Sequence, residues 1–180
     1  MKRFRVLLTA SVVTRVMVKR ALTVLVAVLL LGGQGGIARA ENRGDITAFD
    51  FAFKGEPHGN REAGPYSFAF TNTETDLTGF HLIIFVRIAP AHERATKKEI
   101  IAAIDAAGGP EGICPTCFFD HIAGGAFGPP ASTTPSVGPD LFTPGPVQLL
   151  SGRYAYFCPV HEADGTAHYK LGMFGTFVAR

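Results

Sequence analysis

Every second residue is aromatic over residues 49–53, and the same alternation returns over residues 66–70. A period of two is typical of a β-strand with one buried face, so each segment predicts a strand. Residues 81–88, which read HLIIFVRI, are mostly apolar and predict a strand that is buried on both faces. Three more strands are expected towards the end of the chain, at residues 147–150, 154–158 and 174–178.

One segment has the pattern of a helix. Thr96 and Glu99 have the spacing of a capping box, which marks a helix N-terminus. An apolar stripe follows the box and is formed by Ile100, Ile101 and Ile104. The sequence Gly-Gly-Pro at residues 108–110 then ends the helix.

Gly, Pro, Ser and Thr dominate residues 108–146, which predicts a long irregular segment between strands. Several short strands punctuated by Gly and Pro are typical of an all-β sandwich or barrel. We therefore expect such a fold, with the helix as an excursion on its surface.

The composition excludes one class of function. The chain has 180 residues, of which 47% are hydrophobic, enough for one domain with a real core. Its net charge of +2 depends on residues 1–40, which hold seven basic residues and no acidic one. Residues 41–180 carry 10 Lys and Arg against 15 Asp and Glu. This acidic balance argues against a nucleic-acid-binding protein.

Residues 1–40 have the organisation of a secretory signal peptide. Basic residues precede the apolar run 21–31, and Ala38-Arg39-Ala40 supplies the small residues of a cleavage site. The run of 11 residues is shorter than the roughly 20 that span a bilayer, which disfavours a membrane anchor. We expect cleavage before Glu41, export to the periplasm or the extracellular space, and no membrane attachment afterwards. Translation can start at Met1 or at Met17.

The three cysteines of an exported chain leave at least one thiol unpaired. Cys114 and Cys117 form a CPTC motif, and we expect a small structural disulfide between them. The alternative is a thioredoxin-like redox pair, which requires a parallel-sheet pattern that does not surround this motif. Cys158 then carries the free thiol.

Soft metal ligands gather around this free thiol. His168 and Met173 follow Cys158, and His81 opens the apolar strand directly after a loop. Two imidazoles, a thiolate and a weak axial thioether are the ligand set of a blue-copper site. The sequence therefore predicts copper at His81, Cys158, His168 and Met173. A buried Cys or a core Met is also ordinary in a metal-free protein, so a metal-free form of the same fold remains the alternative.

These residues carry a resemblance to a known family. The sequence GRYAYFC at 152–158, with HYKLGM at 168–173, resembles the C-terminal ligand loop of the cupredoxins. The segment 70–84, from Phe-Thr-Asn to His-Leu-Ile-Ile, resembles the element that carries the first copper ligand of that family. The resemblance implies a cupredoxin-like Greek-key β-sandwich over residues 41–180, with an insertion at about 91–146 that includes the helix.

His161 competes with His168 for the role of second imidazole. It follows Cys158 after two residues, the short spacing of plastocyanin, but eleven residues separate it from Met173. The four residues between His168 and Met173 match the plastocyanin spacing, which favours His168.

The resemblance implies electron transfer or copper handling with one copper, which also requires a partly exposed imidazole. A redox or copper-exchange protein is then the partner, and we expect a monomer. A multicopper enzyme needs further copper centres, and the sequence contains no His-x-His pair to build them. We therefore do not expect an enzyme.

Overall fold

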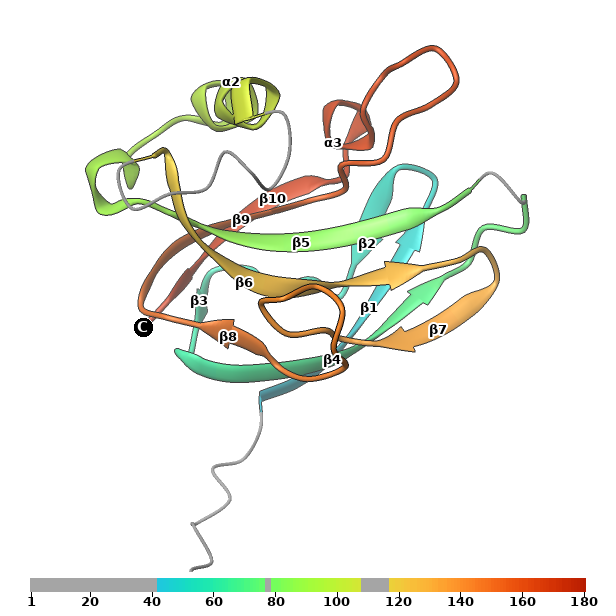
Figure 1. Cartoon of the computed structure of the whole chain (residues 1–180), viewed down its shortest axis with the longest axis horizontal. Coiled ribbons are helices and arrows are strands. Elements are labelled where there is room, and N and C mark those ends of the chain that lie inside the picture. The colour runs from blue at the N-terminus through green and yellow to red at the C-terminus, as the bar shows by residue number, and fades with distance from the viewer. Residues whose placement is uncertain (1–41, 77–78, 108–116) are drawn as a thin grey trace, which may run out of the picture. The chain divides into compact units, whose positions relative to one another are not determined.

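Two five-stranded sheets form a β-sandwich in the computed structural model, which describes residues 42–76, 79–107 and 117–180 (Figure 1). The first sheet has the order β2 (Ala52–Lys54), β1 (Asn42–Phe49), β4 (Gly64–Asn72) and β7 (Ser132–Pro135), and β8 (Val147–Leu149) also pairs with β4. The second sheet has the order β3 (Asn60–Arg61), β10 (Phe174–Ala179), β9 (Gly152–Phe157), β5 (His81–Ile88) and β6 (Phe119–Gly128). The predicted all-β sandwich is confirmed.

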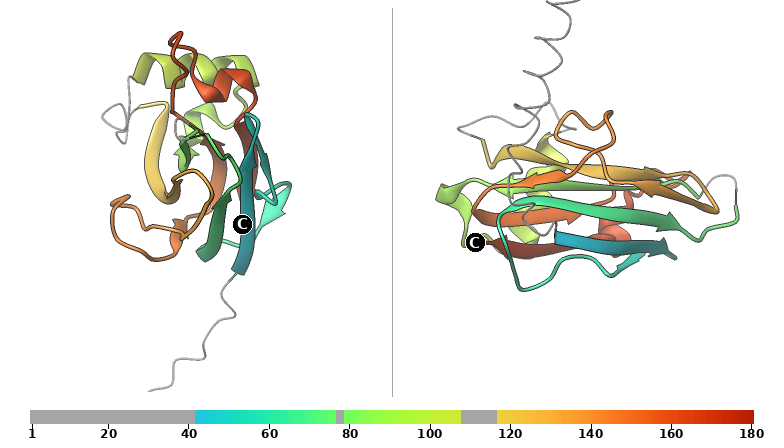
Figure 2. Two further views of the ribbon diagram at one scale, coloured as in Figure 1. Left: turned by 90° about the vertical axis from the view of Figure 1, so that its right-hand side faces the viewer. Right: turned by 90° about the horizontal axis from the view of Figure 1, so that it is seen from below.

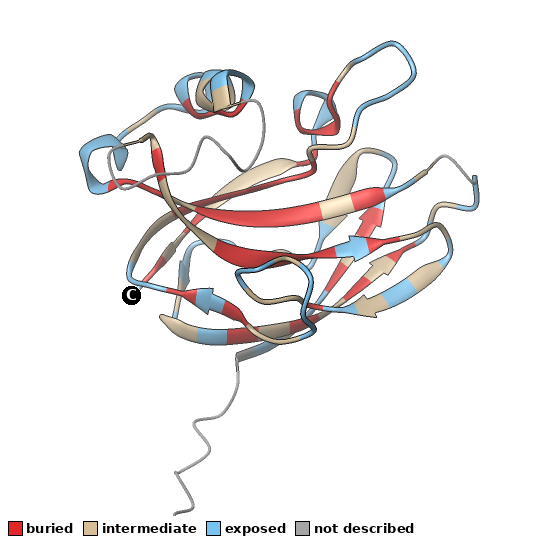
Figure 3. Cartoon of the chain, in the orientation of Figure 1, coloured by how far each residue is buried: buried red, intermediate tan, exposed pale blue. Residues whose placement is uncertain are grey.

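Most neighbouring strands are antiparallel, but β1 runs parallel to β4, and β3 runs parallel to β10. The longest pairing joins β5 to β6, from His81 opposite Gly128 to Ile88 opposite Phe119. On its other side β5 pairs with β9, which places Ile84 opposite Phe157. Strand β5 is therefore a central strand and is buried along most of its length, as its apolar sequence predicts (Figure 3).

The single strand predicted over residues 49–53 is wrong. The chain turns at Asp50 and Phe51, whose φ angles are 39° and 57°, and Phe49 pairs back with Ala52. Two central residues with positive φ make a type I′ hairpin turn, which follows the twist of its strands. The aromatic alternation therefore spans a hairpin, and Phe51 projects from its tip.

The irregular segment predicted over 108–146 is also wrong for residues 119–128 and 132–135, which form strands β6 and β7. The glycines that suggested a loop are required by the sheet. A Cβ atom on Gly125 would lie 2.1 Å from the carbonyl oxygen of Ile83 on the adjacent strand. Gly124 has a φ of 133°, a conformation that L side chains rarely adopt.

The predicted surface helix is confirmed as α2 (Lys97–Ala107). Glu99 accepts hydrogen bonds from the Thr96 backbone N–H at 2.7 Å and its hydroxyl at 2.8 Å, which forms the capping box. Ile100 and Ile104 are buried in a cluster with outward-facing residues of the second sheet, such as Val86. Helix α2 therefore covers one face of the sandwich, as Figures 1 and 2 show.

Two shorter helical elements complete the described chain. A 3-10 turn, η1 (Pro90–His92), follows β5, and the four-residue helix α3 (His168–Leu171) precedes β10. Helices α2 and α3 lie on the same side of the sandwich (Figure 2). The Asp105 side chain of α2 accepts a hydrogen bond from the Tyr169 hydroxyl and pairs with Lys170 at 2.8 Å.

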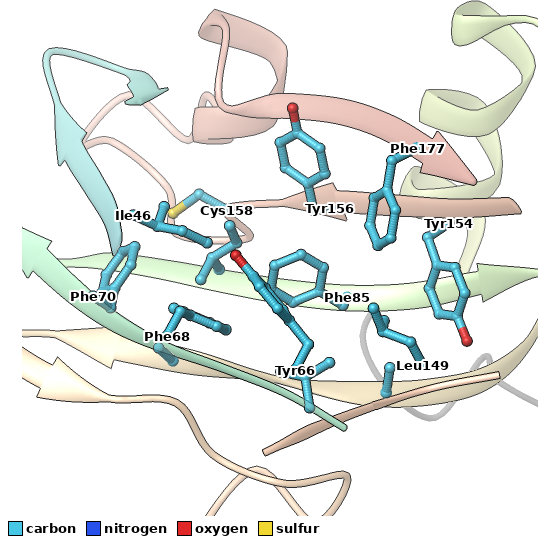
Figure 4. Close-up of a cluster of buried hydrophobic side chains, with 14 of the residues drawn as sticks. Ile46, Tyr66, Phe68, Phe70, Phe85, Leu149, Tyr154, Tyr156, Cys158 and Phe177 are labelled. Carbon is cyan, nitrogen blue, oxygen red and sulfur yellow. The ribbon is translucent and has the colours of Figure 1, made fainter. Parts of the chain in front are cut away.

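Aromatic rings fill the space between the sheets (Figure 4). The largest fully buried side chains include Tyr66, Tyr154, Phe70 and Phe85. Cys158 and Met173 belong to the same buried cluster, and each is 0% exposed. The candidate metal ligands therefore lie against the main core.

Residues 41–180 form one unit of contacts, which holds all of the described residues. The predicted signal peptide, residues 1–40, and the predicted end of the helix at 108–110 lie outside the described residues. Within the described ranges, no helix has the length and apolar character needed to cross a membrane.

Candidate metal centre

Three of the four predicted ligands come together at one point. His81 is the first residue of β5, Cys158 follows β9, and His168 begins α3. The Nδ1 atoms of the two histidines lie 3.2 Å apart, and the Sγ atom of Cys158 lies 3.5 Å from Nδ1 of His168. One ligand atom from each residue lies within 4.8 Å of the others, and these three residues form the only such cluster among the described residues.

The centre is closed to solvent. His81 and His168 are each 2% exposed and Cys158 is 0% exposed. Burial, and then the charge of the neighbouring His168, lower the pKa of His81. Burial raises the pKa of Cys158 to about 11, although the Leu82 N–H donates a hydrogen bond to its sulfur at 3.3 Å. Without a cation, burial therefore favours the uncharged imidazole and the thiol.

The donor set fits a soft metal ion. Nitrogen and sulfur ligands about 2.0–2.3 Å from one ion are about 3.5 Å from each other when they surround it in a plane. The separations of 3.2 and 3.5 Å are close to this value before any ligand moves. Two imidazoles and one thiolate are also the equatorial set of a blue-copper site.

Backbone hydrogen bonds hold the ligand loop in place. The N–H of Cys158 donates to the carbonyl of Met173 at 3.0 Å, and its carbonyl accepts from Tyr169 at 3.1 Å. The N–H of His168 donates to Val160 at 2.8 Å. The segment 158–173 is therefore a closed loop whose ends are fixed to each other.

Met173 is fully buried in the cluster that contains Cys158, and its N–H donates to the carbonyl of His168 at 3.1 Å. Its role as an axial ligand stays a prediction. His161 is exposed and forms a backbone bridge with Ala167, so its side chain is not part of the cluster. The structure thus brings His168, and not His161, to Cys158.

The expectation of a partly exposed imidazole is wrong, because side chains cover both rings. The Nε2 atom of His168 lies 2.6 Å from Oε1 of Glu162, and the ring of Phe51 packs edge-on at 5.1 Å. The Nε2 atom of His81 lies 3.8 Å from Oε1 of Glu74. Sequence reasoning missed these three residues, since only the fold of the loop and the hairpin brings them near the histidines.

Asn72 fixes the loop that precedes His81. Its buried side-chain amide donates to the carbonyls of Gly79 at 2.7 Å and Gly128 at 2.9 Å. Its side-chain oxygen accepts from the N–H of Glu74 at 3.0 Å. The Asn72 side chain thereby joins the end of β4, the loop and β6 at the point where His81 enters the sheet.

Cys158 is a free cysteine in the part of the chain that the structure describes. The predicted disulfide between Cys114 and Cys117 involves residue 114, which lies outside that part. It stays a prediction.

Comparisons with known proteins give likenesses among solved structures. Neither a protein-family profile nor a curated protein matches the chain. Auracyanin A, a blue copper protein from Chloroflexus aurantiacus, is 19% identical, with 78% of this chain and 100% of that chain covered and a TM-score of 0.48. Auracyanin from Roseiflexus castenholzii is 20% identical, with coverage of 78% and 98% and a TM-score of 0.46.

Rusticyanin, a copper protein, is 19% identical, with 77% of this chain and 76% of that chain covered and a TM-score of 0.43. At these identities and scores, the likenesses carry no argument about function. Support for any function has to come from the side chains of this chain. The sandwich that the structure shows is consistent with the cupredoxin-like fold predicted from the sequence.

Proposed function

We propose that this protein binds one copper ion at His81, Cys158 and His168, with Met173 as a weak axial ligand, and that it carries electrons or copper outside the cytoplasm. One observation supports this proposal above all others. Three soft ligand atoms from three separate elements converge within 4.8 Å in a buried place.

The chain supplies what a type-1 copper site requires. Copper adds one-electron redox chemistry when it is bound, and the protein imposes the ligand geometry. Cys158 gives up its thiol proton on metal binding, because only the thiolate is a metal ligand. The backbone hydrogen bonds of the ligand loop hold Cys158 and His168 close to each other.

A metal-free module is the alternative, and the burial of polar groups disfavours it. The Nε2 atom of His81 is buried and has no hydrogen-bond partner. An unsatisfied buried polar atom costs roughly 1–3 kcal/mol, and apolar residues would fill the same space without that cost. A set of two buried histidines and a buried thiol is therefore better explained by a ligand than by packing.

We propose a carrier rather than an enzyme. A copper enzyme has to admit its substrate to the metal, whereas the three clustered ligands are at most 2% exposed. An electron can reach such a site through the protein, and a copper ion can be exchanged when the ligand loop opens. The predicted signal peptide favours a periplasmic or extracellular location. We further propose a redox or copper-exchange protein as the partner and a monomeric state.

Metal analysis tests the proposal. The purified protein is incubated with copper, unbound metal is removed by gel filtration, and the copper content is measured by mass spectrometry. We expect one copper per chain in the wild type and in His161→Ala, but none in Cys158→Ser. Wild-type protein that retains no copper would overturn the proposal and leave the metal-free module.

A further inference from the structure

The outward nitrogen of His168 is occupied by a carboxylate from its own loop. Nε2 of His168 lies 2.6 Å from Oε1 of Glu162, six residues earlier in the chain. The imidazole is 2% exposed, whereas the Glu162 side chain is 43% exposed. Glu162 therefore lies between the buried ring and the solvent.

The turn of the loop brings this carboxylate back onto the ring. The N–H of Glu162 donates to Thr166 at 2.9 Å, and the N–H of Gly165 donates to the carbonyl of Glu162 at 2.9 Å. A backbone bridge joins His161 to Ala167 directly outside this turn. These bonds fix the backbone position of Glu162, so its contact with His168 does not depend on the side chain alone.

The contact fixes the position of a proton. A carboxylate only accepts hydrogen bonds, so Nε2 of His168 has to be the donor. In a neutral imidazole, Nδ1 then carries the lone pair. That lone pair faces Sγ of Cys158 at 3.5 Å and Nδ1 of His81 at 3.2 Å.

The same logic assigns the opposite tautomer to His81 in the metal-free protein. Two Nδ1 atoms at 3.2 Å need one proton between them, and a neutral His168 with its proton on Nε2 has none to give. His81 therefore donates from Nδ1, and its Nε2 atom is left bare. The buried Nε2 of His81 has no hydrogen-bond partner and lies 3.8 Å from Oε1 of Glu74.

We propose that Glu162 is a positioning residue that holds His168 in the tautomer needed for metal binding, so that His81 is the one histidine whose tautomer changes when metal binds. The consequence for metal binding, a higher affinity of the site, rests on the proposed copper function. A ligand histidine that donates its other nitrogen to a carboxylate is oriented and made more basic by it.

Three variants separate the parts of this role. Glu162→Ala removes the acceptor and the charge. Glu162→Gln keeps an oxygen that accepts the hydrogen bond but removes the charge. Asp164→Asn is the matched control, because it removes a charge from the same loop while its side-chain oxygen can keep the 2.8 Å hydrogen bond from Thr166.

Nitrogen NMR of the metal-free protein reads the tautomers directly. We expect Nε2–H for His168 and Nδ1–H for His81 in the wild type, in Glu162→Gln and in Asp164→Asn. In Glu162→Ala we expect a mixture of tautomers at His168, with an unchanged circular dichroism spectrum. A proton on Nδ1 of His168 in the wild type would overturn the role of Glu162. An unchanged tautomer of His168 in Glu162→Ala would overturn it as well.

A competition titration with copper(I) measures the consequence. Loss of such a hydrogen bond costs roughly 10- to 100-fold in metal affinity, which we expect for Glu162→Ala, with a smaller loss for Glu162→Gln and none for Asp164→Asn. Equal affinities in all four proteins would overturn the effect on the metal. A wild type that shows the expected tautomers but binds no copper would contradict the copper function itself.

Discussion

The Nδ1 atoms of His81 and His168 lie 3.2 Å apart, although 87 residues separate the two histidines in the chain. The pairing of β5 with β9 brings the start of β5 beside Cys158, and the closed ligand loop returns His168 to the same place. No short segment of the chain contains this site. The complete ligand set therefore exists only in the folded state.

Copper should consequently stabilise the fold. A ligand at 100 times its dissociation constant adds about 2.7 kcal/mol to the free energy of unfolding when it binds only the folded state. We expect copper(I) to raise the Tm of the wild type in calorimetry and to leave that of Cys158→Ser unchanged. An equal shift in both proteins would mean that the metal binds elsewhere.

The choice between the two candidate imidazoles has its own test. His168→Ala should abolish or grossly alter the copper spectrum, because His168 contributes a nitrogen within the cluster. His161→Ala should change little, because that side chain is exposed and outside the cluster. The opposite result, with His161→Ala losing the spectrum, would show that the loop rearranges when copper binds.

Met173 should tune the site and not form it. An axial thioether is a weak, long ligand, so Met173→Leu should keep the visible colour and change the reduction potential measured by voltammetry. Because Leu has a similar volume, the loss of stability should stay below about 1.5 kcal/mol. A colourless Met173→Leu protein would contradict a merely axial role.

The sequence predicted the strands at 66–70, 81–88 and 174–178, the helix, and the residues that meet at the candidate centre. The predictions from the sequence were wrong where tertiary contacts determine the local structure. The alternating aromatics at 49–53 span a hairpin, because Asp50 and Phe51 adopt positive φ. No sequence pattern indicated a role for Glu162, since that role depends on how its loop folds back onto His168.

Gly125 lies in strand β6, within the segment that the sequence predicted to be irregular, and the physical reason for a glycine there can be tested. Gly125→Ala would put a Cβ atom 2.1 Å from the Ile83 carbonyl, so the pairing of β5 and β6 would have to shift. We expect a loss of about 1–3 kcal/mol or more in urea unfolding. Gly138→Ala is the control, since the nearest atom to its Cβ is 3.9 Å away. Equal stabilities would contradict the close approach of these strands.

The link between α2 and α3 predicts a dependence on pH. Hydrogen bonds from Lys170 and then Tyr169 lower the pKa of Asp105 from its ordinary value of 3.8. Because the folded pKa is the lower one, this stabilisation is present above pH 3.8 and is lost as the pH falls through the folded pKa.

Asp105→Asn can keep the acceptor for Tyr169 but removes the charge. We expect it to lower the free energy of unfolding by up to about 1 kcal/mol at pH 7, since the carboxylate is partly exposed. Urea unfolding at pH 7 and at decreasing pH below 3.8 measures the difference, which should shrink as the pH falls. A difference that persists in acid would show that the charge of Asp105 is not its cause.

The visible absorption spectrum of the wild-type protein after loading with copper(II) tests the central claim most directly. A copper held by the Cys158 thiolate and two imidazoles should give a strong thiolate charge-transfer band in the visible, at one copper per chain. The Cys158→Ser protein, loaded in the same way, should lack this band. A wild-type protein that remains colourless and copper-free would contradict the proposed copper centre.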